Sequence, residues 1–307
     1  MYDVIVVGGA TVDCFVDTGK NLFKPTKDVI KFPFGSKVLL QNVQFYSGGG
    51  ATNISVGLAR MGLKVGCVCK IGKDHNAEMI LQDLAKEDVD TNLVVKKEGR
   101  TGFAVILDAR GHDRTILIFK GSNDLLRFSE IKKRDTQWFY LCTMLGTSFK
   151  TLEKLADYAM KKKIRIAFNP SEYLAKRGYD YLDRILHRTE VLILNREEAM
   201  LLSKKKDIKE ILSTLRGFGA HVCVITNGDK EIHAYDGNHF YQVKPHPTKV
   251  VETTGAGDAF GSGFLSAYIK KKDINFALKV GLVNSESVIQ HYGAKNKLLR
   301  WNELRVK

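Results

Sequence analysis

The sequence lacks the features that mark several large classes of protein. No apolar run in the 307 residues approaches the ~20 that a membrane-spanning helix needs. The five cysteines are scattered without a C-x-x-C pair, and no H-E-x-x-H motif is present, which favours a reducing compartment over a disulfide framework or a zinc site. The opening residues 1–10 are typical of a strand rather than a signal peptide. We therefore expect a cytoplasmic protein with no membrane partner.

Acidic residues are also scarce, with 34 against 48 lysines and arginines and a formal net charge of +14. A surplus of this size raises the question of a nucleic-acid partner. The lysine runs at 161–163, 204–206 and 270–272, however, follow predicted helical segments, where cations complement the helix dipole. They form no basic stripe with aromatic residues between them, so we expect no nucleic-acid binding. The charge would instead help to attract anionic substrates.

The most informative stretch is T-T-G-A-G-D-A-F-G-S-G-F at 253–264, between an extended segment and a run with helical apolar spacing. Gly255 and Gly257 let backbone N–H groups converge at a helix start, an arrangement that binds anions such as phosphate. A carboxylate beside an anion site is electrostatically costly. Asp258 would therefore serve to take a proton from a hydroxyl that attacks the phosphate. Taken alone, G-A-G-D also matches an ordinary turn in which Asp258 caps the helix.

Candidate binding residues also lie at two other places, one after the end of a predicted strand and one at the start of a predicted helix. Asp13 lies beyond a buried strand at 3–7, where open α/β sheets place ligands, although an Asp there can also be a cap. Gly49 and Gly50 precede a predicted helix at 54–61 and allow a close approach of backbone to a ligand. Asn53 offers a donor and an acceptor that suit sugar hydroxyls, or it serves as a cap.

Strands and helices alternate from residue 137 onwards, which is typical of a doubly wound α/β fold. The predicted strands are 137–141, 164–168, 190–194 and 220–225, and the predicted helices are 149–162, 174–187 and 207–216. Segments 14–46 and 91–120 break this rhythm with short strands at 91–95, 102–108 and 115–119. We expect these segments to form a small antiparallel sheet that covers the site as a lid.

The pattern T-G-A-G-D-A-F-x-x-G-F resembles the C-terminal signature of the ribokinase-like (PfkB) carbohydrate kinases. The resemblance spans nearly the whole chain, with V-G-x-x-x-x-D at 7–13, G-G-x-x-x-N at 48–53 and N-x-x-E at 195–198. It implies one domain over 1–307, with a three-layer, mostly parallel sheet and an inserted β lid. No G-x-x-x-x-G-K-[ST] is present, which argues against a P-loop NTPase.

The resemblance also implies a role for each matching residue. Asp258 would be the catalytic base, and the backbone of Gly255, Ala256 and Gly257 would form the anion hole. The phosphoryl acceptor would be held by Asp13, Gly49, Gly50 and Asn53.

ATP would be held by Asn195, Thr226, Gly228 and Asn284, the last on a helix that borders the adenine pocket. Glu198 would hold Mg²⁺ through water, as suits a hard cation that keeps part of its hydration shell. From the residues alone, Asn195 and Glu198 also fit an ordinary helix start, and Thr226–Gly228 fits a hairpin turn.

The reaction implied is transfer of the γ-phosphoryl group of ATP to a primary hydroxyl, with a sugar as the first choice of acceptor. A nucleoside is the alternative, favoured if an apolar or aromatic wall lines the acceptor; Phe15, Phe32 and Phe119 are candidates for it. A sugar phosphate read by Arg100 or Arg114 is a further alternative. A non-catalytic ligand-binding homologue is disfavoured, because binding alone would not require the base.

Two further expectations concern cations and assembly. The family usually has Asp where this chain has Glu252, and family members with that Asp often bind an activating monovalent cation. The extra methylene of Glu displaces the carboxylate by about an ångström, so we expect weak or absent activation by K⁺. The lid is too small to bury both of its faces, and an exposed apolar face usually marks a protein contact. By resemblance we expect a homodimer through the lid. The candidates for the exposed face are Val105, Leu107, Ile116 and Ile118.

Overall fold

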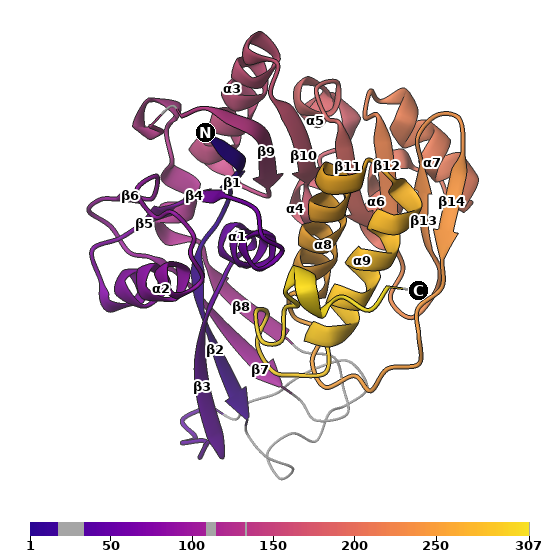
Figure 1. The fold of residues 1–307 in the computed structure, drawn as a ribbon. Coiled ribbons are helices and arrows are strands. Elements are labelled where there is room, and N and C mark those ends of the chain that lie inside the picture. Colours follow the sequence, from indigo (N-terminus) through magenta and orange to yellow (C-terminus); the bar gives the residue numbers. More distant parts are fainter. Residues whose placement is uncertain (18–33, 109–114, 133, 307) are drawn as a thin grey trace.

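An eight-stranded, mostly parallel sheet forms the centre of the protein (Figure 1). A computed structural model describes residues 1–17, 34–108, 115–132 and 134–306. The strand order is β14-β13-β12-β11-β10-β9-β1-β4, and β13 alone among these described strands runs opposite to the rest, antiparallel to both β12 and β14. The strands are β1 Tyr2–Val7, β4 Val65–Val68, β9 Thr136–Cys142, β10 Arg165–Asn169, β11 Val191–Asn195, β12 Val222–Thr226, β13 Ile232–Tyr235 and β14 Phe240–Val243.

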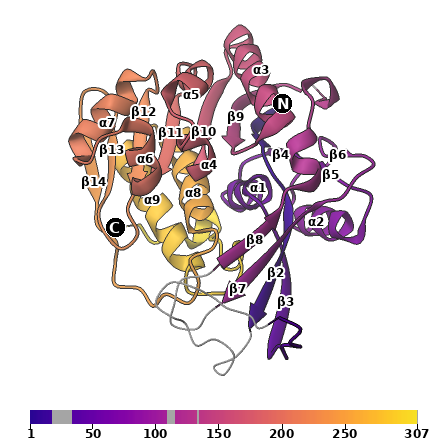
Figure 2. The same ribbon diagram turned by 180° about the vertical axis from the view of Figure 1, so that it is seen from behind.

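Helices cover both faces of this sheet, which explains why its strands are apolar runs rather than alternating ones (Figures 1 and 2). One face packs on α1 Gly50–Arg60, α2 His75–Lys86, α8 Ala256–Lys271 and α9 Ile274–Val288. The other packs on α3 Gly146–Lys162, α4 Ser171–Ala175, α5 Tyr179–Leu186, α6 Arg196–Ser203 and α7 Ile208–Gly217. The predicted three-layer α/β fold is confirmed. None of the helices in the described ranges is both long enough and apolar enough to cross a membrane.

A second sheet projects from the edge at which β1 ends (Figure 1). Its order is β3-β2-β7-β8, with β2 Thr11–Asp17, β3 Asn42–Gly48, β7 Gly102–Asp108 and β8 Thr115–Phe119. We call these four strands the lid. The lid is mixed rather than antiparallel, because β2 and β7 run parallel. The chain passes through the helical body between β3 and β7, so it re-enters the lid from the same end as β2.

The predicted strand at 91–95 does not belong to the lid. The structure has β6 Val95–Lys96 there, which pairs with β5 Lys70–Ile71 in a separate two-stranded sheet. Of the expected lid segments, residues 18–33 and 109–114 lie outside the described residues. The described residues also include three short 3-10 turns: η1 Gly121–Leu125, η2 Phe128–Glu130 and η3 Trp301–Glu303.

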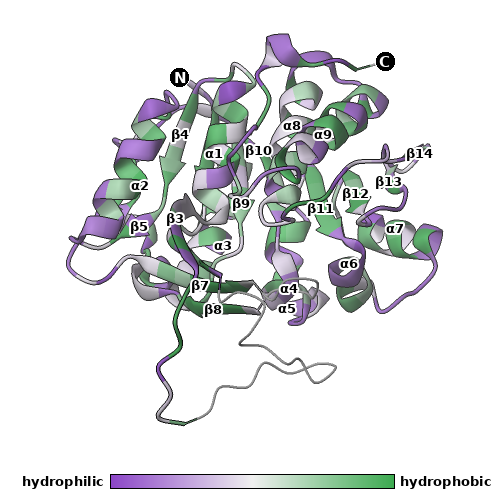
Figure 3. Ribbon diagram, turned by 90° about the horizontal axis from the view of Figure 1, so that it is seen from below, coloured by the Kyte–Doolittle hydropathy of each residue, from purple (hydrophilic) through white to green (hydrophobic). Residues whose placement is uncertain are grey.

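The apolar residues of the lid are divided between its two faces differently from the expectation. The four candidate residues for the exposed face, Val105, Leu107, Ile116 and Ile118, do not share one face. In the β7–β8 register Ile106 lies opposite Ile116 and Ala104 opposite Ile118, so both β8 isoleucines share the face of Ala104 and Ile106. Val105 pairs with Leu117 on the other face. Figure 3 shows β7 and β8 as strongly hydrophobic. The most exposed apolar side chains of that other face are Val43, Phe45, Leu117 and Phe119.

Candidate active site

The carboxyl ends of the central strands and one face of the lid enclose a cavity of about 290 Å³, which we call the lid cavity. Backbone at Gly9 and Gly50 forms part of its floor. Its lid side is apolar and is formed by Ala104, Ile106, Ile116 and Ile118. Five of its polar side chains come from five different elements: Asp13, Asn53, Asn123, Asn169 and Asp258. The cavity therefore presents hydrogen-bonding groups opposite an aliphatic wall.

Asp258 and Asn53 meet at the centre of the lid cavity although 205 residues separate them. The Asn53 amide Nδ2 donates to Asp258 Oδ2 at 2.8 Å. The other end of the amide, Asn53 Oδ1, is buried and has no hydrogen-bond partner among the described residues. A buried acceptor of this kind is costly unless a ligand completes it. A hydroxyl group of a bound substrate would supply the missing donor.

The electrostatics of Asp258 suit a general base. Burial raises its pKa to about 6, the hydrogen bond from Asn53 opposes that rise, and the nearby carboxyl of Asp13 adds to it. The Asp258 carboxylate is therefore more basic than an ordinary Asp and is still mostly ionised at neutral pH. Both properties favour proton transfer from an attacking hydroxyl.

Asp13 lies on β2 in the same cavity and is 8% exposed. Thr11 Oγ1 donates to its Oδ1 at 2.8 Å, and burial raises the pKa of the carboxyl. Gly48 on the paired strand β3 packs against this carboxylate so closely that a Cβ there would lie 1.9 Å from Asp13 Oδ2. The predicted acceptor residues Asp13, Gly49, Gly50 and Asn53 thus all line one cavity.

The first turn of α8 separates the lid cavity from a second one. Thr254, Gly255 and Asp258 line the lid cavity, whereas Thr253, Ala256 and Gly257 line a neighbouring cavity of about 680 Å³. This second cavity lies beside the β13–β14 hairpin, and we call it the hairpin cavity. Gly255 has a φ of +82° and packs on Ala294, so a side chain there would be strained and obstructed. The Ala256 N–H donates to the Thr253 carbonyl at 3.1 Å, so the N–H groups of Gly255 and Gly257 are the ones that the helix start can present, with its positive dipole end, between the two cavities.

The predicted nucleotide residues divide into three groups. Thr226 and Gly228, at the end of β12, line the hairpin cavity. Asn195 and Glu198 lie beside them, since Asn195 pairs in register with Thr226. These two form a reciprocal helix cap on α6: Asn195 Oδ1 accepts from the Glu198 N–H at 2.8 Å, and Glu198 Oε2 accepts from the Asn195 N–H at 2.9 Å. Burial, with smaller contributions from Glu197 and Glu172, raises the pKa of Glu198.

Asn284 does not reach either cavity, in contrast to its predicted place beside adenine. It is fully buried, with Nδ2 donating to the Ala259 carbonyl at 2.7 Å and Oδ1 accepting from the Leu299 N–H at 2.9 Å. Both ends of the amide are therefore used to join α8, α9 and the C-terminal segment. Its neighbour Ser285 lines the hairpin cavity instead.

Several cavity residues escape prediction from sequence. Asn123 holds the backbone of Ala10, with Oδ1 accepting at 2.9 Å and Nδ2 donating at 2.8 Å. Asn169 and Lys120 lie in the lid cavity without any local motif. The proposed aromatic wall is not formed by Phe15 or Phe119, since neither lines the cavity. Arg100 lines neither cavity, and Phe32 and Arg114 lie outside the described residues.

Glu252, the departure from the usual motif, is buried and bends back onto its own loop. Its Oε1 accepts from the Thr254 N–H at 2.8 Å and from Thr254 Oγ1 at 2.7 Å. The carboxylate thus braces the segment that leads into the α8 turn.

The chain is similar to known proteins over most of its length. The sequence profile of the pfkB family carbohydrate kinases matches residues 1–301. The chain belongs to this family. An uncharacterized sugar kinase of Archaeoglobus fulgidus is 32% identical over 250 residues, which cover 80% of this chain and 99% of that protein. The cytidine kinase of Thermococcus kodakarensis is 27% identical over 95% of this chain and 98% of its own length.

Solved structures of the family share the fold over almost the whole chain. The ribokinase of Arabidopsis thaliana with ribose and ATP superimposes with a TM-score of 0.83 at 18% identity, covering 98% of this chain and 97% of that one. The nucleoside kinase of Methanocaldococcus jannaschii gives 0.80 at 21% identity, covering 98% and 96%. A ribokinase-like protein of E. coli, solved with ATP and Mg²⁺, gives 0.84 at 18% identity, covering 99% and 97%. This member of the pfkB family is therefore a kinase with the ribokinase-like fold.

Proposed function

We propose that the protein transfers the γ-phosphoryl group of ATP to a primary hydroxyl of a sugar bound in the lid cavity. The observation that carries this proposal is the position of the α8 start, which forms a shared wall between the two cavities. An acceptor in the lid cavity and a nucleotide in the hairpin cavity would meet at Gly255–Gly257. Asp258 is on the acceptor side of that wall, where a base is needed.

In the reaction, Asp258 takes the proton of the acceptor hydroxyl as its oxygen attacks the γ-phosphorus. The bond from that phosphorus to the β–γ bridging oxygen breaks, and ADP leaves with the electron pair. The N–H groups at the start of α8, together with the helix dipole, stabilise the charge that spreads over the phosphoryl oxygens. Asn53 keeps the Asp258 carboxylate oriented through its 2.8 Å hydrogen bond and accepts from a substrate hydroxyl through Oδ1. The lid face limits the access of water, which suppresses ATP hydrolysis.

Magnesium fits the acidic side chains beside the hairpin cavity. Glu197 and Glu172 lie close enough to Glu198 to add to the rise in its pKa, and a hard divalent cation would favour its ionised form. Within the described ranges no group of three or more His, Cys, Asp or Glu side chains is arranged to hold a metal directly. Glu198 would therefore hold Mg²⁺ through water, with the nucleotide phosphates as its other ligands. Held there, Mg²⁺ would supply positive charge that offsets the negative charge of the nucleotide phosphates.

A nucleoside is the second candidate acceptor, and the aliphatic wall of the lid cavity favours it. A base would pack against Ile106, Ile116 and Ile118, while the ribose hydroxyls would meet Asp13 and Asn53. The relatives include kinases named for both kinds of acceptor.

The test is an ADP-release assay with ATP, Mg²⁺ and a panel of neutral sugars, sugar acids, sugar phosphates and nucleosides. We expect acceptor-dependent ADP release with at least one panel member. Asp258→Asn should lower kcat by at least about 100-fold, as expected for loss of a general base, while leaving ATP binding largely unchanged. Turnover without acceptor dependence would refute the proposed reaction, and near-normal turnover in Asp258→Asn would refute the base.

A further inference from the structure

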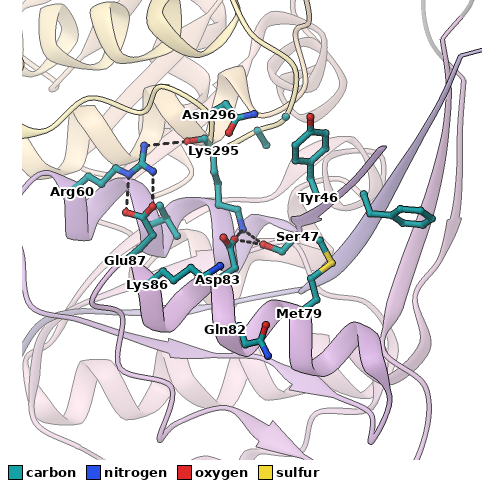
Figure 4. A pocket seen from close by; sticks show the side chains of 14 residues that line it. Tyr46, Ser47, Arg60, Met79, Gln82, Asp83, Lys86, Glu87, Lys295 and Asn296 are labelled. Atoms are coloured by element: carbon teal, nitrogen blue, oxygen red, sulfur yellow. Dashed lines mark hydrogen bonds and ion pairs between the residues drawn. The ribbon is translucent and has the colours of Figure 1, made fainter. Parts of the chain in front are cut away.

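A third cavity, of about 240 Å³, lies behind the lid between β3, α1, α2 and the loop at 293–296 (Figure 4). We call it the rear cavity. Lys295 extends into it from this loop, and its side chain is only 11% exposed. Its Nζ lies 2.6 Å from Asp83 Oδ2 on α2, donates to Ser47 Oγ on β3, and lies 3.5 Å from Thr52 Oγ1 on α1. One ammonium group thus joins the C-terminal loop to three elements.

The three polar groups at the centre of this network form a closed triangle. Ser47 accepts from Lys295 and donates to Asp83, while Asp83 also accepts from Lys295 (Figure 4). Burial lowers the pKa of Lys295, and the charge of Asp83 opposes this. The pair is buried on its Lys295 side only, since the Asp83 side chain is 38% exposed. An ion pair of this kind contributes little net stability compared with apolar packing. The presence of this pair behind the active site therefore calls for a role other than stability.

Two neighbouring residues of the loop, Ala294 and Lys295, act on opposite sides of the lid cavity. Ala294 packs on Gly255, where an added Cβ would lie 2.4 Å from Ala294 Cβ. Lys295 holds Ser47, whose neighbour Gly48 packs directly on the Asp13 carboxylate. Two adjacent residues of one loop therefore set the separation between the start of α8 and the lid strands.

We propose that Lys295 is a positioning residue for phosphoryl transfer, holding β3 and the first turn of α8 in the relation that brings Asp13 and Asp258 to the same substrate. This inference rests on the proposed function and assigns part of its geometry to a residue outside the lid cavity. The charge of the Lys295 ammonium group supports the same role. It lowers the pKa of both carboxyls and so opposes the effects of burial and of their mutual repulsion.

A change of Lys295 would perturb the charged and titratable groups around it. Asp83 is the carboxylate that contacts the ammonium, and Glu87 is engaged by Arg60, whose Nε donates to it at 2.8 Å. The groups that face Lys295 or the two carboxyls from β4, α1, α2 and β9 are Cys67, Arg60, Asp83, Lys86, Glu87, Tyr140 and Cys142. Removal of the negative charge of Asp83 would lower the pKa of the Asp13 and Asp258 carboxyls. Removal of the positive charge of Lys295 would raise it.

The first experiment reads Asp258 directly and needs no substrate. Protein labelled with ¹³Cγ-aspartate is titrated by NMR, and the Asp258 resonance is assigned by its absence in Asp258→Asn. In Lys295→Met we expect the acid dissociation constant of Asp258 to fall at least about three-fold, because a nearby positive charge is lost. Lys297→Met, the same change at an exposed position two residues away, should have no effect. Asp83→Asn should shift the constant in the opposite direction.

The second experiment separates positioning from stability, with D-ribose and cytidine as acceptor probes. We expect Lys295→Met to raise the acceptor KM about ten-fold and to lower kcat. The KM for ATP should stay unchanged, because no residue of the network lines the hairpin cavity. Lys295→Arg keeps the charge and should keep the Asp258 titration of the unaltered protein.

An unchanged Asp258 titration and unchanged acceptor KM in folded Lys295→Met would overturn the inference. If Lys295→Met does not fold, the Asp83→Asn variant decides instead. The inference is overturned if the acid dissociation constant of Asp258 in Asp83→Asn is unaltered, or if it falls as expected for Lys295→Met. Absence of acceptor phosphorylation in the unaltered protein would count against the proposed function, whereas the NMR result would stand independently.

Discussion

Asp258 should reduce the stability of the folded protein at neutral pH, and replacing it should reveal the size of this effect. Burial raises its pKa from 3.8 to about 6. A group with a raised folded-state pKa contributes stability that is fully present below the unfolded pKa and is lost as the pH rises through the folded value. For Asp258 that window runs from about pH 4 to about pH 6. Above it, the folded protein holds a carboxylate that the unfolded chain would solvate better.

The magnitude follows from the size of the pKa change. The rise from 3.8 to about 6 corresponds to about 3 kcal/mol at 1.36 kcal/mol for each pKa unit. The carboxyl lines a cavity that is open to water, so solvent screening reduces the effect, and we expect about 1 to 2 kcal/mol. The amide that Asp258→Asn introduces would retain an oxygen that accepts from Asn53, so the variant loses the charge without losing that hydrogen bond.

The assay is urea unfolding of Asp258→Asn and the unaltered protein at pH 5 and pH 8. We expect the variant to be more stable by about 1 to 2 kcal/mol at pH 8, with a smaller difference at pH 5, although it is nearly inactive. Asp135→Asn, at an exposed position, serves as the matched control and should show no pH-dependent difference. A variant that is less stable than the unaltered protein at pH 8, or a difference that is largest at pH 5, would refute the reasoning.

Two further predictions concern cations and assembly. Since the Glu252 carboxylate accepts two hydrogen bonds from Thr254, exchanging K⁺ for a bulky organic cation at fixed ionic strength should leave the rate nearly unchanged; strong activation by K⁺ would contradict this. Phe45, Leu117 and Phe119 are half exposed on the outer apolar face of the lid, which should pair with a second copy. Sedimentation equilibrium at micromolar concentration should therefore give a dimer that Leu117→Lys dissociates. A fully active monomer near 34.4 kDa would rule the dimer out.

Much of the central fold follows from local sequence, because buried parallel strands are short apolar runs with clear ends. The run predicted at 137–141 became β9, Thr136–Cys142, and the helix predicted at 207–216 became α7, Ile208–Gly217. The lid was less predictable. Alternation shows which residues of one strand share a face, but the relation between strands depends on register, which pairs Ile106 with Ile116. Without that register, the wrong faces of β7 and β8 were combined.

Site residues that lie in motifs were predictable, whereas residues supplied by distant packing were not. Asp258 and Asn53 each stand beside glycines at a helix start, a local signal that needs no tertiary information. Lys295 lies in a loop with no such pattern, and its importance depends on Ser47 and Asp83, which are both distant from it in the sequence. Asn284 is the opposite case: the resemblance suggested a role in ATP binding, but both ends of its side-chain amide make internal hydrogen bonds.

The arrangement of the two cavities separates the chemistry of transfer from the choice of acceptor. Asp258 and the start of α8 belong to the central body, and in the proposed reaction they would act on whatever hydroxyl is brought to them. The aliphatic wall formed by Ala104, Ile106, Ile116 and Ile118 belongs to the lid and would contact the part of the acceptor that does not react. Because the lid joins the body near 9–11, 48–50, 100–102 and 119–121, its wall can change in sequence without moving the base. Acceptor specificity in this protein must therefore be sought mainly in the lid strands.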